Sequence, residues 1–96
     1  MATFISLLNF TDQGVRNVKD SPERYEAFRA MAEKLGVIVK DLYYTVGRYD
    51  IVAVMEGSDE AVTTALLQVC SLGNVRTETL RGFSVDDMKK IIGTMP

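Results

Sequence analysis

The tetrapeptide Gly47-Arg48-Tyr49-Asp50 constrains the fold more than any other feature, because it separates two strand-like runs. These runs are Val37–Val46 and Ile51–Glu56. Glycine adopts the positive φ that a tight reversal requires, and an aspartate side chain accepts hydrogen bonds from nearby backbone N–H groups. The tetrapeptide therefore predicts a β-hairpin. No turn requires an Arg-Tyr pair, so Arg48 and Tyr49 are candidates for a second role.

Two further strand-like runs, Thr3–Phe10 and Val75–Phe83, flank the hairpin. Capping residues mark the starts of the helices between them. Thr11 predicts a short helix to Val18, Ser21 as cap with Pro22 predicts a longer one, and Ser58 predicts a third. The helix that starts at Pro22 has an apolar stripe expected to point inward, formed by Tyr25, Phe28, Met31, Ala32 and Leu35. The corresponding stripe of the helix after Ser58 is Val62, Ala65, Leu66, Val69 and Leu72. The capping box Ser84-Val85-Asp86-Asp87 predicts a terminal helix with Met88, Ile91 and Ile92 inward.

The order of these signals is strand, helix, strand, strand, helix, strand and a final helix. Two right-handed βαβ crossovers joined by a hairpin give a ferredoxin-like α+β fold with an extra C-terminal helix. We expect residues 1–96 to form one domain, with helices on one face of a four-stranded antiparallel sheet. The other face is expected to be apolar and to pair with a second copy as a dimeric α/β barrel. The residues expected to make that face too apolar for water are Phe4, Leu8, Val39, Tyr43, Ala53 and Met55.

Composition excludes several function classes. The chain has no histidine and one cysteine, so it lacks the common ligands of zinc and haem, and we expect no metal and no cofactor. A net charge of −2 without a basic run predicts no nucleic-acid partner. No apolar stretch is long enough for a membrane span, and the first residues do not resemble a signal peptide. A cytoplasmic location is the simplest interpretation.

Three segments carry a resemblance to a known family. Gly47-Arg48-Tyr49-Asp50, the run Thr11-Asp12-Gln13-Gly14-Val15-Arg16-Asn17 and the run Gly73-Asn74-Val75-Arg76-Thr77-Glu78-Thr79-Leu80 resemble the GYD-domain family across essentially the whole chain. Here Arg48 lies between the glycine and the tyrosine of the Gly-Tyr-Asp pattern. The resemblance implies a short bacterial or archaeal protein of the dimeric α/β-barrel type, in a family whose biochemical role is largely undefined.

A more distant similarity joins the hairpin motif and Val75-Arg76-Thr77-Glu78-Thr79 to the effector-sensing domain of leucine-responsive-type transcription regulators. In that family an amino acid binds near the glycine-rich turns, where dimers meet in rings. The similarity implies ligand contacts from Arg76 and Thr77. The chain lacks the amino-terminal helix-turn-helix of those regulators, which argues against direct DNA binding.

The remaining candidates follow from the residues themselves. Arg48, Tyr49 and Asp50 form either a ligand clamp, with the guanidinium gripping a carboxylate, or a structural turn that contacts a neighbouring subunit. Arg16 follows a helix start at which backbone N–H groups can bind an anion. The carboxylate of Asp12 in the first turn, however, already interacts favourably with the positive end of the helix dipole. Tyr43 and Tyr44 point to opposite faces of one strand. We assign Tyr43 to the ligand site, where a phenol can donate a proton or contact an aromatic ligand.

Two functional hypotheses remain. The first is a non-catalytic homo-oligomeric module that binds a small carboxylate or aromatic molecule, or serves in assembly, and needs neither histidine nor metal. The alternative is a cofactor-independent dimeric-barrel enzyme, an oxygenase or isomerase of a small aromatic substrate. The absence of histidine and of an evident acid–base pair favours the first. An RNA-binding sheet is disfavoured, because Ile51–Glu56 contains no aromatic residue for base stacking.

Overall fold

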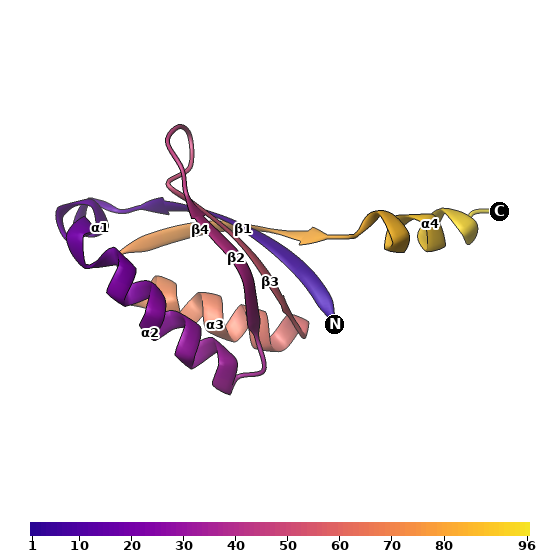
Figure 1. The fold of residues 1–96 in the computed structure, drawn as a ribbon, viewed down its shortest axis with the longest axis horizontal. Helices are drawn as coiled ribbons and strands as arrows, with labels where there is room; N and C mark the ends of the chain where they lie inside the picture. The colour runs from indigo at the N-terminus through magenta and orange to yellow at the C-terminus, as the bar shows by residue number, and fades with distance from the viewer.

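The computed structural model describes residues 1–96 and contains one four-stranded antiparallel sheet with two helices packed on one side (Figure 1). The strands are β1 (Ala2–Phe10), β2 (Ile38–Tyr44), β3 (Ile51–Gly57) and β4 (Val75–Gly82). Their order across the sheet is β2-β3-β1-β4, so β1 and β3 are central. This order follows from two crossovers around a hairpin and confirms the predicted ferredoxin-like α+β architecture.

Capping side chains set most helix starts as the sequence predicts. The helices are α1 (Asp12–Arg16), α2 (Ser21–Lys34), α3 (Asp59–Ser71) and α4 (Val85–Gly93), with a 3-10 turn η1 (Val18–Asp20) before α2. The hydroxyls of Thr11 and Ser58 accept hydrogen bonds from backbone N–H groups at 3.1 Å, and Ser84 forms a capping box with Asp87. These bonds satisfy donors that a helix leaves open at its first turn.

The start of α2 differs from the prediction. Asp20, not Ser21, holds the N-cap position, and its side chain makes no capping bond. Ser21 is buried, and its hydroxyl lies 3.0 Å from the Tyr44 hydroxyl in β2. The preceding helix is also shorter than predicted, because α1 ends at Arg16 and the chain continues into the 3-10 turn. Ser21 therefore connects the helix layer to the sheet.

A bulge in β2 corrects the expected division of side chains between the two sheet faces. The register shifts between Val39 and Asp41, so Val39 pairs with Met55 whereas Tyr43 pairs with Val52. An inserted residue reverses the face of every residue after it. The prediction that all six apolar residues lie on the face away from the helices is therefore wrong: Tyr43 alone lies there, and the other five face the helices. The five on the helix side are Phe4, Leu8, Val39, Ala53 and Met55.

The core lies between this face and the two helices. Buried Ala32, Val37, Val39, Met55 and Val62 form one cluster, against which Phe28 and Leu66 pack from the helices. Leu8, Ile51 and Val75 form a smaller cluster toward the other end. Full burial of a Val, Leu, Ile or Met side chain stabilises the fold by roughly 1.5–3 kcal/mol relative to leaving it exposed.

Candidate functional site

The β2–β3 hairpin is held by hydrogen bonds that reach beyond the turn. The Asp50 backbone N–H donates to Leu8 O at 2.9 Å, and an Asp50 carboxylate oxygen accepts from the Phe10 N–H at 2.8 Å. The Thr45 N–H donates to Asp50 O at 2.8 Å. Gly47 has φ of +145°, a conformation that other residues rarely adopt. Asp50 thus fastens the hairpin to the end of β1, and its carboxylate is engaged in structure.

Tyr49 is also held by a hydrogen bond to another strand of the sheet. Its hydroxyl donates to a Glu78 carboxylate oxygen of β4 at 3.0 Å. The Arg48 guanidinium carbon lies 5.8 Å from the Tyr49 ring centroid, within reach of a cation–π contact. Figure 1 shows the loop rising on the side of the sheet opposite α2 and α3. Neither Arg48 nor Arg76 forms an ion pair, so these two guanidinium groups are available at this end.

The sheet face that the helices leave open carries an aliphatic surface, which we call the open face. Tyr43, Val52, Leu7 and Glu78 stand in register across all four strands, and Ile5, Val54 and Leu80 form the next row. The side chain of Tyr43 is 64% exposed. Along β3 the residues alternate between buried and half-buried, and the half-buried ones are on the open face. The centre of this face is therefore aliphatic although no element of the chain covers it.

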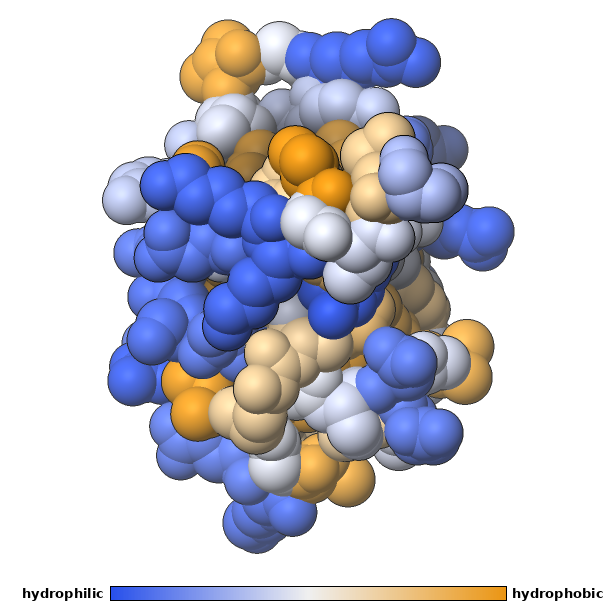
Figure 2. Space-filling view, turned by 90° about the vertical axis from the view of Figure 1, so that its right-hand side faces the viewer, coloured by the Kyte–Doolittle hydropathy of each residue, from blue (hydrophilic) through white to orange (hydrophobic).

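Helix α4 contradicts the prediction that Met88, Ile91 and Ile92 point inward. No residue of α4 is buried, and the helix stands beyond the end of β4, away from the sheet and the other helices (Figure 1). From this end of the molecule, apolar side chains emerge between charged ones (Figure 2). The amphipathic pattern was correct, but the chain itself offers α4 no surface to pack on. Its apolar stripe is therefore left unpartnered.

The predicted site residues do not all lie near the β2–β3 hairpin loop. Arg16 is exposed on α1. Thr77 lies on the helix side of β4, where its hydroxyl is 2.9 Å from that of Thr79. Arg76 pairs in register with Asn9 and is exposed on the open face. The hairpin end thus joins Arg48, Tyr49 and Asp50 in one loop and ties Tyr49 to Glu78, while Arg16 and Thr77 belong to other surfaces.

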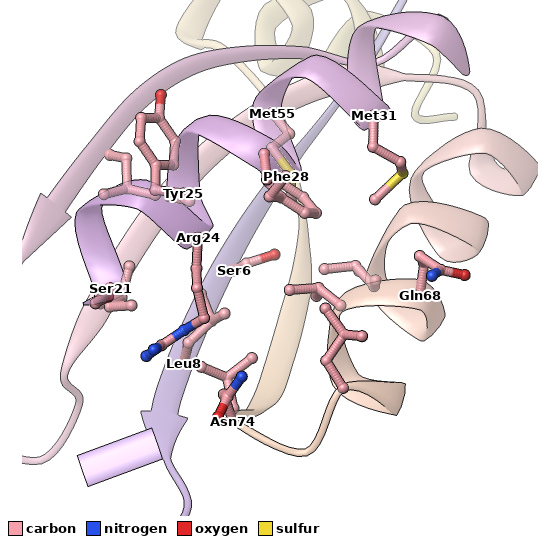
Figure 3. Close-up of a pocket in the computed structure, with 18 of the residues that line it drawn as sticks. Ser6, Leu8, Ser21, Arg24, Tyr25, Phe28, Met31, Met55, Gln68 and Asn74 are labelled. Atoms are coloured by element: carbon pink, nitrogen blue, oxygen red, sulfur yellow. The ribbon is translucent and has the colours of Figure 1, made fainter. Parts of the chain in front are cut away.

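A cavity of about 240 Å³ between the helix layer and the sheet was missed by sequence reasoning (Figure 3). Its walls come from α2, α3 and the helix-side residues of the sheet. Most lining residues are apolar, and the polar ones include Ser6, Ser21, Arg24 and Asn74. Two signals in the sequence pointed to it: Ser6 interrupts an apolar strand, and Arg24 stands at an inward helical position, three residues after Ser21 and four before Phe28.

The structure contains no group of three or more histidine, cysteine, aspartate or glutamate side chains that could hold a metal ion. None of its helices combines the length and the apolar character that crossing a membrane demands.

Comparison with known proteins gives a consistent result. Residues 4–92 match the GYD domain family. A Thermus thermophilus protein described as "Glutamine synthetase and cystathionine beta-lyase binding protein" is 39% identical over 90 residues, covering 92% of this chain and 95% of the relative. The crystal structure of TTHA0845 from Thermus thermophilus superposes with a TM-score of 0.55 at 27% identity, covering 88% and 96% of the two chains. An FFRP protein superposes with a TM-score of 0.61 over 86% of this chain and 100% of the other; at 20% identity it supports the fold alone.

Proposed function

We propose that this chain, which belongs to the GYD-domain family, is a non-catalytic binding and assembly module that acts as a homo-oligomer. The observation that carries the proposal is the excess of surface on the isolated chain. A compact monomer of 10.7 kDa exposes about 5500 Å², whereas this chain exposes 6570 Å². The excess of roughly 1000 Å² is close to the ~800 Å² per partner of a standard protein interface.

The shape of the chain supports the same conclusion. The radius of gyration is 14.6 Å, against roughly 12.5 Å for a compact domain of this length. The extension comes from α4, which leaves β4 through Phe83 and Ser84 (Figure 1). The Arg81 guanidinium lies 4.4 Å from the Phe83 ring centroid and 5.5 Å from that of Phe4, which fixes the direction of the exit. Because α4 lies away from its own domain with its apolar residues exposed, it favours packing on a partner.

The two unpartnered apolar surfaces support the proposal that this partner is a second copy. An antiparallel sheet with one wet face alternates apolar and polar residues, but Leu7, Val52 and Val54 place aliphatic groups on the open face of both central strands. In a two-fold pair, the open faces pack together and each α4 lies on the other copy. Each chain then buries both surfaces with the same contacts, as a closed symmetric dimer requires. The binding-protein description of the 39% identical relative supports a role in protein association.

The oligomeric state tests this proposal. Light scattering coupled to size exclusion should give twice the chain mass or an even multiple, and Val54→Asp should give monomers, because it buries two uncompensated charges at the interface. Ile91→Asp should weaken the assembly through α4. Thr63→Asp, on the exposed side of α3, is the matched control and should leave the mass unchanged. A monomeric wild-type chain at concentrations up to the millimolar range would refute the proposal.

The ligand of this module is a small carboxylate bound at the hairpin end. Arg48 carries the argument, because its guanidinium has no acidic partner and offers bidentate geometry to a carboxylate. Arg76 supplies a second cation on the open face, and Tyr43 a phenol that is exposed in the isolated chain, so in the proposed dimer both would lie where the two copies meet. An amino acid or a short dicarboxylate should raise the melting temperature of the wild type, and Arg48→Ala should abolish that rise. Arg29→Ala, on the outer face of α2, serves as the control.

A further inference from the structure

The cavity between the helix layer and the sheet has the size and the lining of a ligand site. A cavity of about 150 Å³ accepts a benzene molecule, so the ~240 Å³ here has room for a longer or branched apolar group. Apolar side chains dominate the walls, among them Leu8, Phe28, Met31, Leu42 and Val69. Small-molecule sites are typically apolar, with a few placed polar groups that fix orientation.

Arg24 is the exceptional group in this lining. It extends from α2 into the cavity (Figure 3). One guanidinium nitrogen, Nη1, donates to Asn17 O at 2.7 Å, which fixes the side chain. The other, Nη2, is fully shielded from solvent and has no hydrogen-bond acceptor. No carboxylate of the chain forms an ion pair with Arg24. A shielded donor on a charged group without a partner is strongly unfavourable.

Three hydroxyl groups of the lining, those of Ser6, Ser21 and Tyr44, already have hydrogen-bond partners within the chain. Ser21 Oγ lies 3.0 Å from Tyr44 Oη, and Ser6 Oγ lies 2.9 Å from Thr79 Oγ1. Arg24 therefore stands out as the one lining group with a buried donor left open. An acceptor from a ligand placed there would complete the guanidinium, and a negatively charged acceptor would form the strongest bond.

We propose that this cavity binds an amphipathic carboxylate, such as a medium-chain fatty acid, with the carboxylate on Arg24 and the apolar tail between α2, α3 and the sheet. The charge of the guanidinium selects an anion, its fork geometry suits the two oxygens of a carboxylate, and the apolar walls select the tail. This site is distinct from the hairpin end, since it lies on the opposite side of the sheet. It makes the chain a carrier or sensor of apolar acids irrespective of whether the hairpin binds a small carboxylate.

Isothermal titration tests the proposal with three probes. Decanoate, below its micellar concentration, should bind the wild type. Decanol has the same tail without the charge, and acetate has the charge without the tail; each should bind at least about tenfold more weakly than decanoate, because each lacks one of the two contacts. Equal binding of decanol and decanoate would show a non-specific apolar site and would overturn the assignment to Arg24.

Two variants locate the binding. Arg24→Gln should reduce decanoate affinity at least about tenfold, because a neutral amide replaces the charge-assisted bond, whereas Arg29→Gln, on the same helix but ion-paired with Glu33 and exposed, should not. Ala53→Leu places a larger group at the cavity wall and should block decanoate in a protein that remains folded by circular dichroism. Arg48→Ala should bind decanoate normally even if it loses a small carboxylate. If decanoate fails to bind, or if Arg24→Gln binds it normally, the proposal is wrong.

Discussion

Gly14→Ala is expected to destabilise the protein by about 3 kcal/mol or more. A Cβ at Gly14 would lie 2.0 Å from the Asn74 carbonyl oxygen and 2.9 Å from its carbon, so the backbone of one segment must move. That oxygen also accepts the Thr11 N–H at 3.0 Å, the bond that joins the start of α1 to the loop between α3 and β4. Alanine gains at most about 1 kcal/mol in helix propensity, which is too little to offset overpacking together with a strained hydrogen bond.

Urea denaturation at one fixed protein concentration measures this loss, since the stability of an oligomer depends on concentration. Gly93→Ala is the matched control. Gly93 is the last residue of α4, and nothing lies within 4 Å of a Cβ built there. Its replacement should leave stability unchanged or raise it by less than about 1 kcal/mol. Similar urea midpoints for Gly14→Ala and the wild type would contradict this prediction, since the loop between α3 and β4 would then move away from the new Cβ without loss of stability.

Local chemistry predicted the elements of this fold, because their signals are short in range. The Ser58 cap, the box at Ser84 and the hairpin glycine depend on the residue types within one turn, and the structure confirms each of them. The strand order followed from the sequence of elements. The faces of β2 were harder to predict, because the bulge between Val39 and Asp41 leaves no mark in the alternation of apolar residues.

The candidate sites were harder to predict because they depend on what surrounds a side chain. Asp50 was expected to bond within its turn, yet its carboxylate accepts from Phe10, forty residues away. The stripe of α2 was read from apolar residues alone, which left out Ser21 and Arg24 although both face inward. For α4, periodicity identified the apolar side but gave no information on which molecule covers it. Periodicity reports which residues avoid water, and only a structure shows the surfaces they meet.

Met55→Ala is expected to destabilise the protein by about 2–5 kcal/mol. Met55 is 1% exposed and is the largest fully buried side chain of the sheet. It contacts the core cluster with Ala32, Val37 and Val62 and also lines the cavity. Removing its thioether loses dispersion contacts on the core side and leaves an empty volume that joins a space already open. The surrounding backbone belongs to a central strand bonded on both sides, so it has little freedom to collapse into that volume.

The control is Met95→Ala, since Met95 is 69% exposed near the end of the chain and should change stability by less than about 0.5 kcal/mol. Decanoate adds a second readout on the same variant. A ligand that binds the folded state stabilises it by mass action, so decanoate should raise the urea midpoint of Met55→Ala as well as that of the wild type, because the enlarged cavity still retains Arg24. A midpoint for Met55→Ala equal to that of Met95→Ala would contradict the tight packing of this position. A destabilised variant that decanoate fails to protect would instead place the tail of the ligand against the Met55 side chain.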